Sequence, residues 1–224
     1  MHYQEIWIKA GTYAKRKYIP VWEVHTNLPR GCEQALLPFH ALTGSDTTSY
    51  IRNHPKVSAW KQFILHHALL KELGEGHLTE KKLADAENFV CRLYNHGNVT
   101  SVNQIRQMMF LTIDKAELMP PTQDALQQHL MRVHFQSMVW KQAITPIPVL
   151  PNPVDMGWKL HNGELKPMLM TIDAIPMTCT NIVFCKCKKL YKTRQCSCRY
   201  NNNLCAASCR CCSGHIPCSN RSPD

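Results

Sequence analysis

The sequence predicts a mainly α-helical protein with a short N-terminal β-hairpin and a small cysteine-rich module at its C-terminal end. Apolar residues recur with the period of an α-helix in several stretches between residues 31 and 143. Apolar and polar residues alternate, as they do in strands, over residues 4–24. Ten of the 12 cysteines follow residue 178. With a mass of 25.7 kDa, the chain is long enough for one hydrophobic core and a small satellite module.

The N-terminal alternation predicts two strands joined by a basic turn. The segment "GTYAKRK" separates the two apolar runs, and we expect its "AKRK" part, residues 14–17, to be a solvated turn. Nuclear import and phosphate contact are alternative roles for that part. The apolar positions assigned to the two strands are Ile6, Ile8, Ile19, Val21 and Val24.

Two helical stretches follow. The first, "CEQALLPFHAL", is apolar on one side, and Pro38 is expected to interrupt it. The second, "VSAWKQFILHHALLKEL", predicts an apolar stripe along one helix face. The residues of that stripe are Trp60, Ile64, Leu65, Ala68 and Leu69.

Two further helical stretches begin with N-capping residues. Thr79 precedes "EKKLADAENFVCRLY", and Thr122 follows two prolines and precedes "QDALQQHLMRVHFQSMVWKQA". We expect a buried row in each helix. The rows are Leu83, Ala86, Val90 and Leu93 in the first, and Leu126, Leu130, Val133 and Trp140 in the second.

Prolines mark the end of the helical region. Pro146, Pro148, Pro151 and Pro153 predict an extended, rather stiff linker. After them, Asn162 and Gly163 form a type I′ turn signal between two short extended runs, which predicts a second hairpin. We therefore divide the chain into a helical core (residues 1–143), a linker with a hairpin (residues 144–178) and a cysteine-rich domain (residues 179–224).

Charge and hydropathy narrow the classes of partner. The formal net charge of +10 and the pI of about 9.1 favour a polyanion such as nucleic acid. The sequence has neither an apolar run of about 18 residues nor the pattern of a signal peptide. We therefore expect an intracellular protein, nuclear or cytoplasmic, with reduced thiols and no membrane partner. The sequence indicates no small-molecule substrate and does not indicate the oligomeric state.

The crowded cysteines indicate metal binding. In a reduced chain, such crowding is more typical of metal ligands than of disulfides. About three zinc ions with four ligands each could be held by nine thiolates if three of these bridge neighbouring ions. A metallothionein-like metal buffer and a tail that never folds are the alternatives. The nine candidate ligands are Cys185, Cys187, Cys196, Cys198, Cys205, Cys209, Cys211, Cys212 and Cys218.

The cysteine spacing resembles that of the tesmin-type CXC domain, a DNA-binding zinc module, over about the last forty residues. Seven cysteines from Cys185 to Cys211 fall on the C-x-C-x3-C-x4-C-x-C-x6-C-x3-C-x-C pattern of that domain, but Tyr191 stands at the third position. Either Cys212, next to the pattern, replaces that ligand, or the cluster is incomplete. Gln195 stands where tesmin relatives have a tyrosine that enters the DNA minor groove, which argues against base recognition.

The resemblance also implies a DNA-contacting surface on this tail. Eight lysines and arginines lie between residues 185 and 224, against Asp224 as the only acid. We expect these cations to contact DNA phosphates. The predicted DNA-binding residues are Lys186, Lys188, Lys189, Lys192, Arg194, Arg199 and Arg210.

A second resemblance covers the rest of the chain. The segments "FHALTGSDTTSY" and "VSAWK" resemble a motif of uncharacterised animal proteins that look like relatives of the flap-endonuclease branch of PIN-like nucleases. This resemblance implies a truncated PIN-like α/β core in which Asp46 matches a Mg²⁺-binding aspartate. The other metal aspartates of the family would lie upstream of this chain. The family's DNA-gripping "GKGK" reads "NHPK" here, and Pro55 has no N–H to offer a phosphate.

We therefore assign structural roles to most remaining polar residues. Asp46 is expected to end a helix and to cap the next turn through its carboxylate, with Thr47 and Thr48 assisting. We expect Cys32 and Cys91 to be buried thiols. The remaining acids and histidines that could be mistaken for metal ligands are expected at the surface: Glu80, Asp85, Glu87, Asp114, Asp124, His66, His67, His129 and His134.

Together these features predict a zinc-dependent DNA-binding protein that is a non-catalytic relative of a structure-specific nuclease. Catalysis by this chain alone is not expected, because one carboxylate does not make a two-metal site. A mobile or multiplied gene family is one origin compatible with this interpretation. The alternatives are the C-terminal part of an active Mg²⁺-dependent nuclease whose other carboxylates lie upstream, and the metallothionein-like protein.

Overall fold

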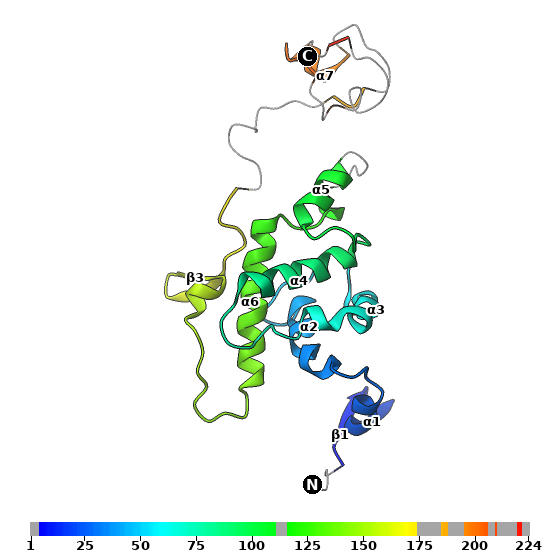
Figure 1. Ribbon diagram of the computed structural model, residues 1–224, viewed down its shortest axis with the longest axis vertical. Coiled ribbons are helices and arrows are strands. Elements are labelled where there is room, and N and C mark those ends of the chain that lie inside the picture. The colour runs from blue at the N-terminus through cyan, green and yellow to red at the C-terminus, as the bar shows by residue number, and fades with distance from the viewer. Residues whose placement is uncertain are drawn as a thin grey trace.

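The structure is a computed structural model that describes residues 5–110, 116–173, 185–187, 195–205, 209 and 219–220. Within these residues the chain is mainly helical, with one β-hairpin before the helices and another after them. The predicted helical character and the N-terminal hairpin are confirmed (Figure 1). None of the helices in the described ranges is both long and apolar enough to cross a membrane.

The N-terminal hairpin pairs β1 (Trp7–Gly11) with β2 (Arg16–Pro20), with Ile8 opposite Ile19. The second strand is shorter than predicted, because helix α1 (Val21–Thr26) begins directly after Pro20. Val21 and Val24 are therefore helical, and their assignment to a strand was wrong. Proline has no N–H for a strand ladder and has a φ suited to the start of a helix, so Pro20 is where the strand gives way.

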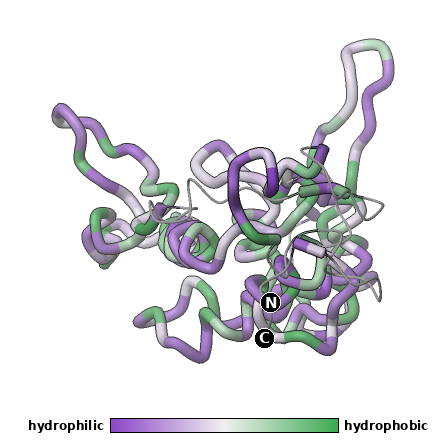
Figure 2. The backbone as a smooth tube through the Cα atoms, turned by 90° about the horizontal axis from the view of Figure 1, so that it is seen from above, coloured by the Kyte–Doolittle hydropathy of each residue, from purple (hydrophilic) through white to green (hydrophobic). Residues whose placement is uncertain are grey.

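This hairpin leaves much apolar surface in solvent. Ile8 is 53% exposed, Tyr18 57% and Tyr13 90%. Its closest aromatic pair is Trp7 and Trp22, whose rings meet edge to face with centroids 4.9 Å apart. Figure 2 shows hydrophobic and hydrophilic residues mixed along the extended segments that project from the helices. The stability of the chain therefore comes mainly from the helical region.

The helical core begins with a 3₁₀ turn, η1 (Cys32–Ala35), that continues into α2 (Leu36–Leu42). Pro38 is the third residue of α2 and does not interrupt it. The N–H groups of the first turn have no acceptor within a helix, so a proline is tolerated there. Phe39 and Leu42 point into the core from this helix.

Helix α3 (Lys56–His66) buries a different face from the one predicted. Ala59 and Phe63 are buried, whereas Leu65 is 71% exposed. The predicted stripe of Trp60, Ile64, Leu65, Ala68 and Leu69 assumed one continuous helix. Instead the helix ends at His66 and a 3₁₀ turn, η2 (His67–Leu69), follows. The tighter 3₁₀ turn rotates the later residues relative to an α-helix, which brings Leu70 and Leu73 into the core.

Helices α4 (Glu80–Leu93) and α6 (Gln123–Lys141) begin at the predicted caps. Thr79 Oγ1 accepts a hydrogen bond from Lys82 N at 3.3 Å, and Thr122 Oγ1 accepts one from Ala125 N at 3.2 Å. Between them lie α5 (Val102–Phe110) and the 3₁₀ turn η3 (Ala116–Leu118). The predicted rows are buried except at their ends, where Leu83 and Trp140 are only partly covered. The buried residues are Ala86, Val90 and Leu93 in α4, and Leu126, Leu130 and Val133 in α6.

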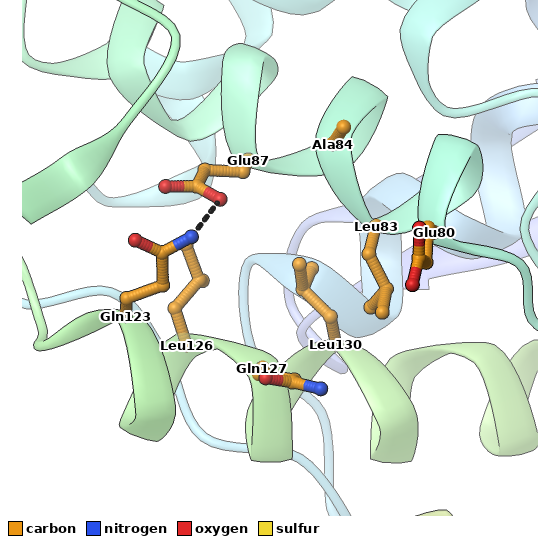
Figure 3. Close-up of a pocket in the computed structure, with 8 residues that line it drawn as sticks. All are labelled: Glu80, Leu83, Ala84, Glu87, Gln123, Leu126, Gln127 and Leu130. Atoms are coloured by element: carbon orange, nitrogen blue, oxygen red, sulfur yellow. Dashed lines mark hydrogen bonds between the residues drawn. The ribbon is translucent and has the colours of Figure 1, made fainter.

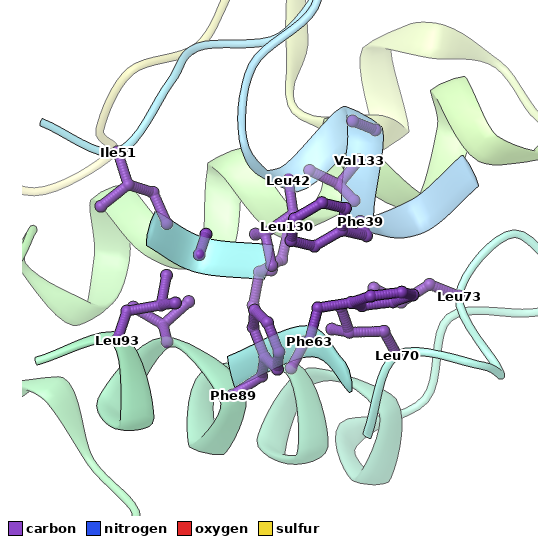
Figure 4. Packing of buried hydrophobic residues seen from close by; sticks show 14 of the residues in the cluster. Phe39, Leu42, Ile51, Phe63, Leu70, Leu73, Phe89, Leu93, Leu130 and Val133 are labelled. Carbon is purple, nitrogen blue, oxygen red and sulfur yellow. The ribbon is translucent and has the colours of Figure 1, made fainter. Parts of the chain in front are cut away.

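Three phenylalanines form the centre of the core. The ring centroid of Phe39 lies 4.4 Å from that of Phe63 and 6.4 Å from that of Phe89. These rings come from α2, α3 and α4. Figure 4 shows leucines of α2, α4 and α6 around them, together with Leu70 and Leu73 from the segment after η2. Burying one such aromatic ring contributes about 2–3 kcal/mol, so this cluster holds the four helices together.

Residues 144–173 form a strap that folds back against α6. The strap contains the 3₁₀ turn η4 (Pro153–Met156) and a hairpin of β3 (Trp158–His161) and β4 (Glu164–Pro167). Asn162 and Gly163 both have positive φ, 51° and 79°, so the type I′ turn is confirmed. Figure 1 shows this hairpin on the side of α6 away from α3 and α4. The boundaries at residues 143 and 178 stay predictions.

Side chains of α6 attach the strap. Arg132 Nη1 donates to the Gly157 carbonyl oxygen at 2.9 Å and to the Met168 carbonyl oxygen. At the start of α6, the Asp124 carboxylate accepts from Thr171 N at 2.6 Å and from Ile172 N at 3.0 Å. The Thr171 hydroxyl also donates to this carboxylate, at 2.6 Å. The carboxylate therefore holds the end of the strap, and the hydrogen bond from the Thr171 hydroxyl, followed by those from the backbone N–H groups, lowers the pKa of Asp124.

We predict that Gly157→Ala destabilises the protein much more than Gly163→Ala does. Both glycines have positive φ, but a Cβ at Gly157 would lie 2.5 Å from the Gln128 carbonyl oxygen, whereas one at Gly163 would meet nothing within 4 Å. The Gly157 variant should lose about 2–4 kcal/mol and the Gly163 variant about 1 kcal/mol of unfolding free energy. Urea denaturation followed by tryptophan fluorescence measures both. Equal losses would contradict this packing of the strap on α6.

Candidate metal centre

Six cysteines gather in the C-terminal part of the chain. All six are at most 8% exposed, and none is in a disulfide. They form an apolar cluster of their own, separate from the helical core. The six are Cys185, Cys187, Cys196, Cys198, Cys205 and Cys209.

The distances between sulfur atoms fit ligands of one cation. The Sγ atoms of Cys185, Cys196, Cys198 and Cys205 all lie within 4.8 Å of one another. Cys205 Sγ is 3.7 Å from Cys185 Sγ and 3.8 Å from Cys196 Sγ. Tetrahedral zinc with Zn–S bonds of about 2.3 Å requires sulfurs about 3.8 Å apart. A disulfide would need about 2.05 Å. The arrangement therefore suits a shared metal ion such as zinc.

Local backbone structure turns the thiols toward one another. Lys186 is exposed between the buried Cys185 and Cys187, as expected for an extended C-x-C unit. The second unit lies at the start of the short helix α7 (Ser197–Tyr200), where Tyr200 N donates to the Cys196 carbonyl oxygen at 2.9 Å. Beyond α7, Asn203 N donates to the Cys198 carbonyl oxygen at 2.8 Å, and this turn leads the chain back to Cys205.

Asn220 supports the cluster from outside it. Its Nδ2 donates to Cys205 Sγ at 3.4 Å and to the Asn203 carbonyl oxygen at 2.9 Å. Its carbonyl oxygen accepts from Cys205 N at 2.6 Å. Next to it, Arg199 Nη2 donates to the Ser219 carbonyl oxygen at 2.8 Å. An N–H donor at a thiolate orients the ligand and offsets its charge, and no spacing rule in the sequence points to Asn220.

The cluster strongly disfavours thiolates unless a cation is bound. Burial, followed by the neighbouring thiols, raises the pKa of Cys187 to about 12, and burial and the Cys209 thiol raise that of Cys198 to about 12. A bound divalent cation supplies the positive charge that allows such thiols to ionise. Binding should therefore release protons and weaken at low pH.

The other predicted residues of the tail divide into two groups. Cys209 joins the cluster, with its Sγ 3.6 Å from that of Cys198. Arg199 is partly buried against Ser219, and Gln195 is exposed. The rest lie outside the described residues, so the number of ions and the replacement of Tyr191 by Cys212 stay predictions. That group comprises Lys188, Lys189, Tyr191, Lys192, Arg194, Arg210, Cys211, Cys212 and Cys218.

Asp46 does not have the role that was expected of it. Its side chain is exposed, and its carboxylate accepts no hydrogen bond within the described part of the chain. Hydroxyl groups close the turn instead. Ser45 Oγ lies 2.7 Å from Thr48 Oγ1, which donates to the Ala41 carbonyl oxygen at 2.7 Å. Lys56 Nζ donates to the Gly44 carbonyl oxygen, so this lysine is also used within the turn.

The turn after α2 also shows why a carboxylate cap is unnecessary there. Ser45 N donates to the Thr48 carbonyl oxygen at 3.0 Å, so the backbone closes the turn itself. Thr47 Oγ1 donates to Gln136 Oε1 at 2.6 Å and thereby ties the turn to α6. Among the described residues, the tail cysteines are the only group of three or more His, Cys, Asp or Glu side chains placed to hold a metal.

Three residues expected at the surface are buried. Glu87 is 9% exposed, His129 7% and His134 0%. Figure 3 shows Glu87 in a pocket between α4 and α6, where its Oε2 accepts from Gln123 Nε2 at 3.0 Å. His134 Nδ1 accepts from Gly74 N at 2.9 Å. The expectation was wrong because neighbouring segments cover the sides of α4 and α6 that carry these three residues, whereas other polar side chains of α6, such as Gln127, stay exposed.

The remaining residues expected at the surface differ in how far their side chains are exposed. Glu80 is exposed, and Asp85 forms an ion pair with Lys81 at 2.7 Å on the surface of α4. His66 and His67 are partly buried, and Asp124 is engaged by the strap. Asp114 lies outside the described residues. Cys32 and Cys91 are buried thiols, as predicted, and burial raises the pKa of Cys91 to about 11.

No protein-family model, curated protein or solved structure matches this chain. The resemblances to the CXC domain and to PIN-like nucleases therefore stay predictions. The metal centre rests on the geometry of its thiols alone.

We predict that Asn220→Ala speeds the removal of zinc from the full-length protein by a chelator about tenfold. The variant loses the N–H donor at Cys205 Sγ, and such second-layer contacts commonly change metal affinity by about 10–100-fold. A chromogenic chelator with stopped-flow detection measures the rate. Asn201→Ala is the control, because Asn201 Nδ2 donates only to the Ser197 carbonyl oxygen. Equal rates in the two variants would show that Asn220 does not support a metal ligand.

A second prediction concerns the buried His129. Burial, which outweighs the hydrogen bond to Leu42, lowers the pKa of His129 from 6.5 to about 4. The unfolded chain then binds a proton that the folded chain rejects, so this stability is complete above pH 6.5 and is lost as the pH falls toward 4. The loss should approach about 1.4 kcal/mol per pH unit within this window.

The measurement is urea denaturation between pH 4 and 8, followed by tryptophan fluorescence. His129→Gln should flatten the dependence, because glutamine can still donate to the Leu42 carbonyl oxygen but does not titrate. The control variant is His161→Gln, which changes an exposed histidine of β3. A pH profile that His129→Gln leaves unchanged would rule out His129 as its source.

Proposed function

We propose that this chain is a zinc-dependent DNA-binding protein and a non-catalytic relative of a structure-specific nuclease. The observation that carries the proposal is the cluster of six buried thiols, four of which have Sγ atoms within 4.8 Å of one another. Metal binding by a cluster of this kind can stabilise the folded state of a short segment that has little other apolar surface to bury. The basic residues interleaved with the cysteines would then be presented on a folded module.

The charge of the chain supports DNA as the ligand. The net charge is +10, and the tail is basic between its cysteines. Lys186 is exposed directly between two buried thiols, so this C-x-C unit presents a cation to solvent while its two cysteines belong to the thiol cluster. Zinc offsets the thiolate charge, so the outer surface remains positive. Such a surface binds phosphates with little dependence on base sequence.

A metal buffer is the second candidate, and the thiol cluster alone would serve it equally well. The two candidates differ in one property, since a buffer needs no polyanion contact. We propose the DNA-binding role because of the cations between the cysteines. The exposed Asp46, which has no neighbouring carboxylate cluster in the described ranges, favours the non-catalytic form of the proposal.

The metal content can be tested on the full-length protein. We expect native mass spectrometry to count about three zinc ions per chain, with Cys198→Ser and Cys205→Ser lowering the count. Cys32→Ala is the control, because Cys32 is a buried thiol of the helical core. A count of zero, or a count that none of these variants changes, would contradict zinc binding by this cluster.

DNA binding should be weak, dependent on salt and nearly independent of sequence. Replacing Lys186, Lys188 and Lys189 with alanine should lower the slope of log K against log salt by up to about 2.7, which is about 0.9 for each lost phosphate contact. The matched control removes three charges from the N-terminal hairpin: Lys15, Arg16 and Lys17. Fluorescence anisotropy with duplex DNA measures both. A larger loss in the control would place the binding surface on the hairpin, and zinc binding without DNA binding would favour the buffer.

A further inference from the structure

A second cavity, of about 340 Å³, lies in the helical region and is independent of the metal centre. It is bounded by the turn at residues 49–52, by the end of α4, by the first three turns of α6 and by the strap. Most of its wall is apolar or aromatic, with contributions from Ile51, Tyr94 and Leu126. This size is at the small end of the range for pockets that bind small molecules.

The strap completes the wall of this cavity. Leu169 and Met170 line it, and they directly precede the two residues whose N–H groups bind the Asp124 carboxylate. Arg132 holds the strap at a second point through the Met168 carbonyl oxygen. The wall is therefore fixed on both sides of the lining residues by charged side chains of α6.

One polar group of the lining lacks a partner. His129 Nε2 lies 3.0 Å from the Leu42 carbonyl oxygen. Because a carbonyl can only accept, Nε2 carries the proton, and Nδ1 presents a lone pair. This Nδ1 is buried and accepts no hydrogen bond from any described residue. A buried acceptor without a donor is unfavourable, and a ligand that carries an O–H or N–H group would satisfy it.

The same stretch of α6 also supplies an unpaired cation. Arg132 is 2% exposed, and its two hydrogen bonds go to backbone carbonyl oxygens. No carboxylate forms an ion pair with it within the described residues, and no described residue that lines the cavity is acidic. Arg52 adds a second positive charge to the lining. An enclosed guanidinium without a counter-charge favours an anionic ligand.

We propose that this cavity binds a small amphipathic carboxylate that also carries a hydroxyl or N–H group. The carboxylate pairs with the guanidinium of Arg132, and the donor group satisfies His129 Nδ1. His129 and Arg132 are at positions i and i+3 of α6, so their side chains lie on the same face of the helix. The apolar body of the ligand contacts Ile51, Tyr94 and Leu126. A carboxylate alone would leave the His129 acceptor unsatisfied, so both groups are required.

Three related probes test the two polar contacts on the full-length protein by isothermal titration calorimetry. The probes are 4-hydroxyphenylacetate, phenylacetate, which lacks the hydroxyl group, and 4-hydroxyphenylacetamide, which lacks the charge. We expect the first to bind about three- to tenfold more tightly than the second, which is the usual effect of one hydrogen bond. The third should bind at least about tenfold more weakly than the first, because a hydrogen bond to a charged group is stronger.

Two variants assign the binding to this cavity. His129→Gln keeps a donor for the Leu42 carbonyl oxygen, but its acceptor Oε1 no longer lies at the position of the ring Nδ1, so it should abolish the preference for the hydroxyl group. Ala125→Phe fills the cavity and should abolish binding of all three probes. Gln127→Phe is its matched control, because Gln127 is an exposed α6 residue that lies outside this cavity.

The proposal fails if no probe binds at millimolar concentration, or if phenylacetate binds as well as its hydroxylated analogue. It also fails if Ala125→Phe binds the probes as the native chain does. If His129→Gln does not fold, the comparison of probes and the pair of phenylalanine variants still decide.

Discussion

Side chains of helix α6 form hydrogen bonds with backbone groups of the segments packed around it. The packing of the helical region depends on these hydrogen bonds. His129 donates to the end of α2, and His134 accepts from Gly74 in the loop before α4. Arg132 donates to Gly157 and Met168 of the strap, and Lys141 donates to the Leu73 carbonyl oxygen at 3.1 Å. A loop covering a buried helix would otherwise leave unpaired carbonyl oxygens, each costing about 1–3 kcal/mol. The polar residues of α6 therefore allow irregular segments to pack on it.

The two ends of the chain are stabilised by different physics. The helical region has three packed phenylalanines and leucines from α2, α4 and α6. The described part of the tail buries cysteines almost alone. A cluster of thiols gains little from the hydrophobic effect, but it gains much from a cation that binds several sulfurs at once. Loss of metal should therefore unfold the tail and leave the helical region intact.

The comparison of Asp46 with the tail cysteines shows how differently two motifs constrain a structure. An aspartate in a polar turn can be replaced in its capping role by nearby hydroxyls, and Ser45 and Thr48 close this turn. Cysteines that share one cation have few such substitutes, since each position needs a thiolate, an imidazole or a carboxylate. Spacing therefore predicted that six of the tail cysteines cluster, but it did not predict the role of the aspartate.

Short stretches of the sequence by themselves determined the helix caps, the tight turn and the paired cysteines. Thr79 and Thr122 cap helices because each hydroxyl accepts a hydrogen bond from the backbone N–H group three residues later. Asn162 and Gly163 form a turn because both tolerate positive φ. Cys185 and Cys187 are buried on one side because alternate residues of an extended chain share a side. None of these outcomes needed knowledge of a distant segment.

Only the tertiary structure decided which faces were covered. Glu87, His129 and His134 are polar and were expected in solvent, but other segments enclose α4 and α6 on the sides that carry them. The buried face of α3 also differs from the periodic one, because the helix ends at His66 and a 3₁₀ turn changes the phase of the residues that follow. The spacing of apolar residues predicts which face of a helix packs against an apolar layer. It does not indicate a polar side chain whose hydrogen-bond partner is the backbone of a loop tens of residues away. The second cavity could therefore not be predicted from the sequence.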